Sequence, residues 1–314
     1  MHLLRQILPA VCCMTLFFSC SKDSDTIEDE TLTSQLDPTE RAAAKKLYED
    51  YYVASKNEAS DVAWSGDEPS CNAGSVPENI RTKLIMRIHY FRKAVGLNNT
   101  ITENPSKSEK SQQAALMMHA NGTLDHSPPE SWKCFTAEGK EGAGNSLLTS
   151  TKNSVAIDSY MRDQGSDNYP VGHRRWLLWP RLQEIGIGNT SQYNALWVLG
   201  NPGTTPEDAP EFVAWPPKGY LPKNLAYQRW SFSIPKADFT QTSIKMKTLS
   251  GTNISLEIEE LDDAYGDRTI VWRPDINVYD TVEDVTYKVI IENVLIDDTP
   301  QDYEYEVTLF DPDN

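Results

Sequence analysis

The segment YPVGHRRWLL, residues 169–178, is the part of the sequence from which the fold and the candidate site can be worked out. Pro170 and Gly172 interrupt regular structure and stand directly before His173. An imidazole in such a setting lies just outside a helix, where side chains from several segments converge on a cleft. His126, in the motif LDHSPP, has the same kind of surroundings. This setting alone leaves a place in a cleft and a purely structural role equally open for His126 and His173.

Helices are predicted around this segment by the helical spacing of apolar residues and by residues that favour helix ends. One amphipathic pattern begins at Pro77 and stops at Gly96, a typical C-terminal residue. Asn104 followed by Pro105 is typical of a helix start, and this second helix is expected to end near Gly122. The four helices are expected over residues 37–52, 77–95, 105–121 and 150–164.

Two short apolar runs, residues 184–188 and 195–199, have Gly and Asn around them and predict a buried antiparallel pair of strands. Six prolines then fall within residues 201–224, which excludes a continuous helix or a central strand there. Farther along the chain, apolar residues alternate with polar ones. This last part is expected to be an all-β sandwich of the immunoglobulin-like or fibronectin-like kind.

Charge restricts the partners of the chain. The sequence has 29 basic and 46 acidic residues, which gives a net charge of -17, and most of this charge lies within residues 251–314. Long-range repulsion therefore excludes nucleic acid and anionic lipid surfaces as partners. Asp262, Asp263 and Asp267 are candidate calcium ligands in this acidic part, although a solvated face that deters aggregation is the simpler interpretation.

The first 19 residues have the features of an export signal, because Arg5 precedes an apolar run too short to span a bilayer. The run ends in LFFSC, which resembles the lipobox of bacterial lipoproteins and implies that Cys20 is acylated; ordinary secretion is the alternative. The polar segment after Cys20 is similar to the signal that sends some Gram-negative lipoproteins to the outer face of the outer membrane. We therefore expect a surface-exposed protein that contacts the membrane only through its N-terminal lipid.

Cysteine usage agrees with export. Cys12 and Cys13 are removed with the signal and Cys20 takes the lipid, so Cys71 and Cys134 remain as the one available pair. A disulfide between these two residues is expected in an oxidising compartment, and two buried thiols are the alternative.

Several motifs together resemble a known family. IMRIHYFR at residues 85–92, VGL at 95–97, His126, VGHRRWLL at 171–178 and IGIG at 185–188 follow one another as they do in the CAP superfamily. That family includes cysteine-rich secretory proteins, antigen 5 and PR-1 proteins, and is also called SCP-like. The resemblance covers about residues 78–200. It implies a CAP-type α/β/α sandwich with a central cleft. Together with the immunoglobulin-like sandwich predicted from the alternating pattern, this makes the chain α+β.

The resemblance also implies a set of cleft residues, because two histidines and two acidic residues line the cleft in this family. His126 and His173 match the histidine positions, and Asp163 stands where the family has a glutamate. At the position of the second acid, the motif GAGNSL offers Asn145 or Gly144 instead. Two neutral imidazoles and one carboxylate could hold Zn²⁺ or another divalent metal, but the missing carboxylate removes the obvious general base.

Three functions are compatible with these residues. The preferred interpretation is a surface-anchored binding module whose cleft takes a small apolar ligand, a peptide or a glycan, and family members are associated with lipid or sterol binding. A metal-dependent hydrolase or peptidase is one alternative, although the sequence lacks the HExxH, Walker, GxGxxG and GxSxG signatures. A non-catalytic structural scaffold is the other. The aromatic candidates for lining the cleft, which are equally suited to core packing, are Trp176, Trp179, Trp197 and Trp215.

The chain is expected to divide into six segments. These are a signal peptide over residues 1–19, a tether over 20–36, a helical extension over 37–76, the CAP domain over 77–200, a proline-rich linker over 201–224 and the sandwich over 225–314. Polar and charged residues dominate the tether, so we expect it to be a flexible leash.

Overall fold

The structure is a computed structural model that describes residues 38–61, 63–278 and 283–314. The expected signal peptide, the expected anchor residue Cys20 and the tether lie outside the described residues. The described residues form one compact unit. None of the helices in the described ranges is long and apolar enough to cross a lipid bilayer.

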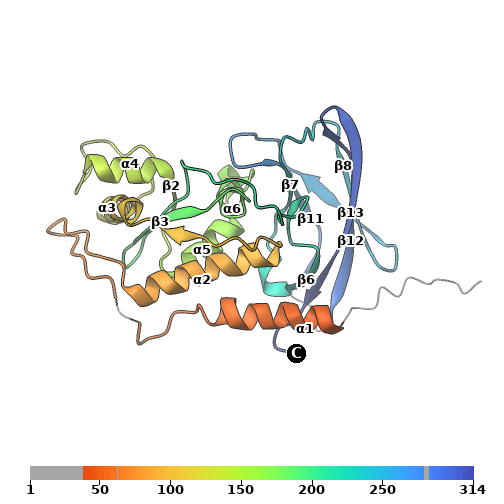
Figure 1. Ribbon diagram of the computed structural model, residues 1–314, viewed down its shortest axis with the longest axis horizontal. Helices are drawn as coiled ribbons and strands as arrows, with labels where there is room; N and C mark the ends of the chain where they lie inside the picture. The colour runs from red at the N-terminus through yellow and green to blue at the C-terminus, as the bar shows by residue number, and fades with distance from the viewer. Residues whose placement is uncertain (1–37, 62, 279–282) are drawn as a thin grey trace, which may run out of the picture. The chain divides into compact units, whose positions relative to one another are not determined.

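The helices predicted from the sequence are confirmed, with ends close to the residues that signalled them (Figure 1). The Asn104 side chain accepts a hydrogen bond from the Lys107 backbone N–H at 3.2 Å and so caps α3. Gly122 ends α3 in the left-handed conformation that suits glycine. The bounds are α1 Pro38–Leu47, continued by the π-helix η1 Tyr48–Val53, then α2 Glu78–Ala94, α3 Pro105–Asn121, α4 Ala137–Asn145, α5 Ser154–Arg162, the 3-10 turn η2 Ser166–Asn168 and α6 Gly172–Leu177.

Helices α4 and α6 were not expected. Three glycines among the nine residues of α4 disfavour a helix, but the Thr136 hydroxyl caps it by accepting the Gly139 backbone N–H at 2.9 Å. The prediction that His173 lies outside a helix is wrong, because it occupies the first turn of α6. The buried Asp163 carboxylate accepts the backbone N–H of His173 at 2.9 Å. A residue ten positions upstream therefore supplies the cap that the local sequence lacks.

A four-stranded sheet forms the centre of the helical part, in the order β1-β3-β4-β2. Its strands are β1 Thr102–Glu103, β2 Ser146–Thr149, β3 Glu184–Asn189 and β4 Asn194–Trp197. Strands β3 and β4 form the antiparallel pair that the two apolar runs predicted, β2 joins β4 antiparallel, and β1 joins β3 in parallel.

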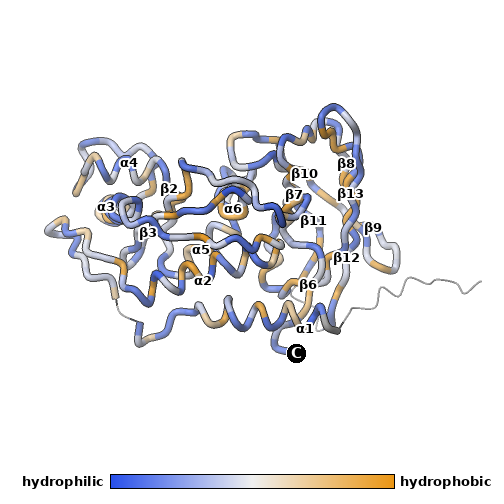
Figure 2. The backbone as a smooth tube through the Cα atoms, viewed as in Figure 1, coloured by the Kyte–Doolittle hydropathy of each residue, from blue (hydrophilic) through white to orange (hydrophobic). Residues whose placement is uncertain are grey.

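Helices cover both faces of this sheet, as the alternation of its side chains shows. Leu148 of β2 and Ala195 of β4 pack with buried residues of α3 and α4. Their neighbours Leu147 and Leu196 point to the other face, into a core shared with α2 and α5. The arrangement is therefore the expected α/β/α sandwich (Figure 1), in which apolar and polar residues alternate along α2 (Figure 2).

Two glycines of β3 allow α3 to approach the sheet closely. A Cβ on Gly186 would lie 2.5 Å from the Lys107 carbonyl carbon, and a Cβ on Gly188 would lie 2.0 Å from the Ser111 carbonyl oxygen. Any side chain at these positions would push α3 away from the sheet. The IGIG motif is thus explained by packing: its isoleucines face one core and its glycines make room for a helix on the other face.

The remaining strands form a β-sandwich of two sheets, ordered β10-β11-β7-β5 and β6-β13-β12-β8-β9. With β5, β7, β8, β10, β11, β12 and β13 lettered A to G along the chain, one sheet holds A, B, E and D and the other holds C, F and G, which is the immunoglobulin arrangement. The bounds are β5 Val213–Trp215, β6 Gly219–Pro222, the 3-10 turn η3 Lys223–Leu225, β7 Trp230–Ile234, β8 Ser243–Thr248, β9 Asn253–Ile254, β10 Leu256–Ile258, β11 Arg268–Pro274, β12 Val285–Ile296 and β13 Thr299–Phe310.

The proline-rich segment 201–224 contains two of these strands, so it is more than a connection. Strand β5 pairs with β7, and β6 runs parallel to β13. Both are edge strands, where proline is tolerated because one side of the strand makes no ladder hydrogen bonds. The prediction that the prolines exclude a central strand is therefore confirmed, but the edge strands β5 and β6 were not predicted.

One continuous hydrophobic core joins the α/β/α part to the sandwich. The ring of Phe91 in α2 contacts the fully buried ring of Trp215 in β5 edge-on, with centroids 5.2 Å apart. A second contact between the two parts is the ion pair, 2.7 Å long, between the Arg41 guanidinium of α1 and Asp284 of the sandwich. The sandwich is thus packed against the helices instead of being held at a distance from them.

Candidate functional site

The short helix α6 sends its side chains in two directions. His173 and Trp176, three residues apart on one face, line a pocket. Arg174 and Arg175 are buried and reach the sandwich. The motif Gly-His-Arg-Arg-Trp therefore supplies both the candidate site and the junction between the two parts of the molecule.

His173 is held by a buried carboxylate. Its Nδ1 lies 2.7 Å from Oδ1 of Asp163, whose side chain is 0% exposed, whereas the imidazole is 23% exposed. A buried carboxylate that also accepts backbone N–H groups acts as an acceptor toward the imidazole, so Nδ1 is the donor, and in the neutral form of His173 Nε2 carries the lone pair. Asp163 is therefore a positioning residue for the imidazole and does not reach the pocket itself.

His126 is oriented in the same sense by a different partner. It lies in the loop between α3 and α4, and its Nδ1 is 3.0 Å from the Ala143 carbonyl oxygen near the end of α4. A carbonyl can only accept, so Nδ1 donates and Nε2 is again the acceptor. Within the described residues, Nε2 of neither histidine has a hydrogen-bond partner. Two acceptor nitrogens are thus presented at one site.

The loop that carries His126 is tied down by a disulfide. Cys71 and Cys134 are bonded, which confirms the pairing expected from cysteine usage. The bond connects the segment before α2 to the segment between His126 and α4. Asn121, at the end of α3, adds hydrogen bonds to the backbone of Lys133 through both its amide nitrogen and its oxygen, each at 3.1 Å.

His126 and His173 lie on the same pocket, which has a volume of about 280 Å³. The walls combine two imidazoles, two larger aromatic rings, one carboxylate, one amide and several apolar groups. The lining residues are His126, Gly144, Ser146, Leu147, Asp167, Asn168, Pro170, Gly172, His173, Trp176, Leu199 and Tyr265. Such a mixture suits a small ligand with both apolar surface and polar groups.

The donor set does not fit a catalytic zinc ion, which takes three protein ligands and keeps one open position. Within the described ranges, no three His, Cys, Asp or Glu side chains are placed to hold a metal. Asp163 is fully buried and already accepts N–H groups of His173. Asn145 does not line the pocket, and its amide donates to the Glu141 carbonyl at 2.9 Å. Of the four residues predicted as cleft or metal ligands, only His126 and His173 therefore line the pocket, each with Nε2 as its free ligand atom.

The two other histidines of the described residues have structural partners. Nε2 of His89 accepts the Ile101 backbone N–H at 3.3 Å, and burial lowers the pKa of this imidazole. The ring of His119 packs between Trp64 and Tyr193, with centroids 5.3 and 6.0 Å away. Neither lines the pocket.

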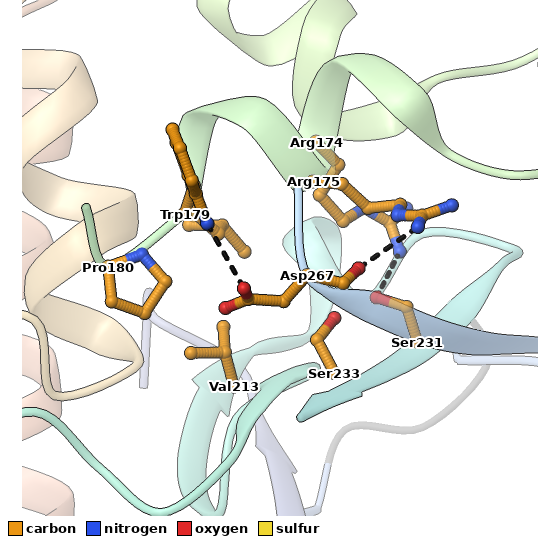
Figure 3. A pocket seen from close by; sticks show the side chains of 9 residues that line it. Arg174, Arg175, Trp179, Pro180, Val213, Ser231, Ser233 and Asp267 are labelled. Carbon is orange, nitrogen blue, oxygen red and sulfur yellow. Dashed lines mark hydrogen bonds between the residues drawn. The ribbon is translucent and has the colours of Figure 1, made fainter. Parts of the chain in front are cut away.

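The arginines of α6 cross the junction to the sandwich (Figure 3). Arg174 donates to the Arg229 carbonyl at 2.8 Å and to the Ser231 hydroxyl at 3.1 Å. Arg175 donates to the carbonyls of Asp262 and Asp267 at 2.7 and 2.9 Å. Burial lowers the pKa of both arginines to about 10, so they stay charged at neutral pH. The cavity beside them has a volume of only about 10 Å³, too small for an organic ligand.

The acidic residues considered for calcium have other roles. The Asp267 carboxylate accepts the Trp179 indole N–H at 3.1 Å, and Asp263 forms an ion pair with Arg268. Asp262 contributes its backbone carbonyl to Arg175. These groups fix a loop of the sandwich in place.

Sequence reasoning missed several lining residues. Of the four candidate tryptophans, only Trp176 lines this pocket. Asp167 and Asn168 lie in η2, close in sequence to His173, so their position beside the motif was an available signal. Tyr265 belongs to the loop between β10 and β11, nearly 100 residues away, and the sequence contains no signal for its presence here.

The fold and the paired histidines define a CAP-type domain joined to an immunoglobulin-like sandwich. Residues 86–199 match the model of the cysteine-rich secretory protein family, CAP. This part of the chain is therefore a CAP domain, as the sequence motifs implied. No curated protein matches the chain.

Proposed function

We propose that the pocket around His126 and His173 binds a neutral, hydroxyl-bearing ligand, and that the chain is a glycan-binding module. The observation that carries this proposal is the pair of Nε2 lone pairs beside two aromatic rings in one pocket. Sugar hydroxyls can donate to the two imidazole acceptors, while the apolar face of a sugar ring packs on an indole or a phenol. Asp167 and Asn168 add further polar partners.

The lining argues against other ligand classes that the sequence left open. No Lys or Arg is among the pocket residues, so an anionic headgroup or a peptide carboxylate finds no fixed positive partner. A purely apolar ligand would cover the imidazoles, Asp167 and Asn168 without replacing their hydrogen bonds to water, which is unfavourable. A volume of about 280 Å³ lies at the small end of ligand pockets, so a short saccharide unit fits best.

Titration of the purified protein with neutral saccharides tests the proposal. The panel comprises glucose, galactose, mannose, N-acetylglucosamine and their common disaccharides, followed by calorimetry and saturation-transfer NMR. At least one should bind, and His173→Ala should weaken that binding by about tenfold, since one hydrogen bond and its ring contact are lost. Ser127→Ala, which alters an exposed neighbour of His126 outside the lining, is the matched control. Absence of binding across the panel contradicts the proposal.

Hydrolysis is a second candidate, favoured by the pairing of buried Asp163 with His173. Such a pair can orient Nε2 to take a proton from a water molecule as its oxygen attacks the substrate, and to return the proton to the leaving group. Incubation with the same disaccharides and with p-nitrophenyl acetate tests this. Turnover that disappears in both Asp163→Asn and His173→Ala supports catalysis, and turnover unaffected by either variant rules out this role.

We further propose that the protein is exported and anchored through lipid on Cys20, at the outer membrane surface. The Cys71–Cys134 disulfide supports an oxidising compartment, where such bonds persist. Expression with an alkyne-labelled fatty acid should label the wild-type chain and leave Cys20→Ala unlabelled. Protease added to intact cells should then digest the wild-type protein. Labelling of Cys20→Ala would contradict the proposed anchor.

A further inference from the structure

The sandwich contributes directly to the wall of the histidine pocket. Tyr265, in the loop between β10 and β11, lines the pocket together with His126 and His173. Every other lining residue comes from the CAP part of the chain. The pocket wall therefore combines residues of the CAP part with a residue of the sandwich that is far from them in sequence.

Arg175 fixes the loop that carries Tyr265. Its guanidinium donates to the carbonyls of Asp262 and Asp267, which lie on either side of Tyr265 in the loop. The same guanidinium lies 5.5 Å from the centroid of the Tyr265 ring, within the range of a cation–π contact. Because Arg175 is only 5% exposed, these contacts are shielded from water.

Two further contacts hold the loop against α6. The Trp179 indole donates to the Asp267 carboxylate, and Figure 3 shows this bond beside the one from Arg175 to the Asp267 backbone. At the start of α6, Gly172 leaves space for the phenol: a Cβ there would lie 2.8 Å from two carbons of the Tyr265 ring. The ring thus packs on bare backbone next to His173.

We propose that Tyr265 is a specificity-determining residue of the pocket, through which the immunoglobulin-like sandwich limits what reaches His173. The inference rests on the proposed binding function. The phenol is held from three sides, by Gly172, by Arg175 and by its own anchored loop, so it forms a fixed wall. It lines the pocket beside the two imidazoles that would hold the ligand. The sandwich is accordingly part of the binding site and not a spacer.

Access to the imidazoles can be measured without knowing the ligand. Diethyl pyrocarbonate modifies exposed imidazole nitrogens, and peptide mass spectrometry gives the rate for each histidine. In Tyr265→Ala the rate at His173 should rise at least about threefold, whereas His89, whose Nε2 is occupied outside the pocket, should keep its rate and serves as the internal control. Leu261→Ala, an exposed change in the same loop, should leave both rates unchanged. An unchanged rate at His173 in Tyr265→Ala overturns the inference.

Gly172→Ala supplies an independent variant in case Tyr265→Ala loosens the loop. The added methyl group would collide with the phenol and displace it while leaving the loop sequence intact. We expect Gly172→Ala to raise the rate at His173, and to have no such effect in the Tyr265→Ala background, because the ring it displaces is already gone. Equal effects of Gly172→Ala in both backgrounds contradict a role for the ring.

The saccharide panel separates this inference from the proposed function. If the wild-type protein binds a sugar, Tyr265→Ala should change the ratio of dissociation constants between two panel members by about fivefold or more. Constant ratios would refute the specificity role and leave glycan binding standing. If no sugar binds, glycan binding fails, and the modification rates at His173 decide whether Tyr265 forms the wall.

Discussion

The Asp163 carboxylate contacts His173 twice, at 2.7 Å through the imidazole Nδ1 and at 2.9 Å through the backbone N–H. One buried group therefore sets both the start of α6 and the orientation of the ring that projects from it. Asp163 itself ends α5 in the left-handed conformation, with φ at 49°. The contact between the end of α5 and the start of α6 thus fixes the position of the His173 imidazole.

The tautomer of His173 is expected to depend on Asp163. In Asp163→Asn, the amide can turn its NH₂ toward the imidazole, which would then carry its proton on Nε2 instead of Nδ1. ¹⁵N chemical shifts of the neutral imidazoles, read by long-range ¹H–¹⁵N correlation, report the change. His126 is the control, since its partner is the Ala143 carbonyl. A His173 spectrum identical to wild type contradicts the assignment.

Much of the fold could be predicted from sequence because its signals are local. Asn104-Pro105 and Gly122 marked the ends of α3, and the period-two pattern marked β12 and β13. Helix α6 could not be predicted, because its cap comes from Asp163 and not from the residue before it. Strands β5 and β6 were hidden for a related reason: proline is tolerated only at a sheet edge, and an edge is defined by the whole sheet.

The site residues likewise fall into those that local motifs predicted and those that tertiary contacts place. His126 and His173 were found from motifs that resemble the CAP family, and the structure brings them to one pocket. Asn145 was predicted from its place in the GAGNSL motif alone and is not part of the pocket wall. Tyr265 reaches the pocket through tertiary contacts of Arg175, which no local pattern encodes.

Replacing Arg175 by lysine is expected to destabilise the junction. A lysine ammonium can reach one of the two carbonyls of Asp262 and Asp267, so at least one buried charged hydrogen bond is lost. The free energy of unfolding should fall by about 2 kcal/mol. Denaturant titration gives this value. Arg268→Lys, an exposed change at an ion pair with Asp263, should cost about 0.5 kcal/mol or less. Equal losses in both variants would refute the special role of Arg175.

Removing the disulfide should lower stability without changing the fold. Cys71 and Cys134 are separated by 63 residues, and closing a loop of this length stabilises a protein by about 4 kcal/mol in the chain-entropy model. The paired variant Cys71→Ser/Cys134→Ser should unfold correspondingly earlier in urea. Dithiothreitol should destabilise the wild type and leave the variant unaffected. A variant as stable as the oxidised wild type contradicts this expectation.

Acid should remove a contribution made by Asp61. A hydrogen bond from Lys83, helped by the Glu58 backbone N–H and by two side-chain amides, lowers the pKa of Asp61 from 3.8 to about 2. A depressed carboxyl pKa stabilises the folded state above the unfolded value and loses that effect as pH falls through the folded value. The stability difference between wild type and Asp61→Asn should therefore be present at pH 6 and shrink between about pH 4 and pH 2. Melting curves across this range measure it, and a difference that grows toward pH 2 would show the opposite sign.

Arg174 makes the CAP part and the sandwich depend on each other, so the two parts are expected to evolve together. Its guanidinium is 1% exposed and takes the Arg229 carbonyl and the Ser231 hydroxyl as partners from the sandwich. A genetic crossover between residues 199 and 213 that brought in an unrelated sandwich would remove these two partners and leave the buried guanidinium with the Met161 carbonyl alone. Exchange of the sandwich between genes is therefore expected to succeed when the incoming sandwich places acceptors at the same two points, or when an uncharged residue replaces Arg174.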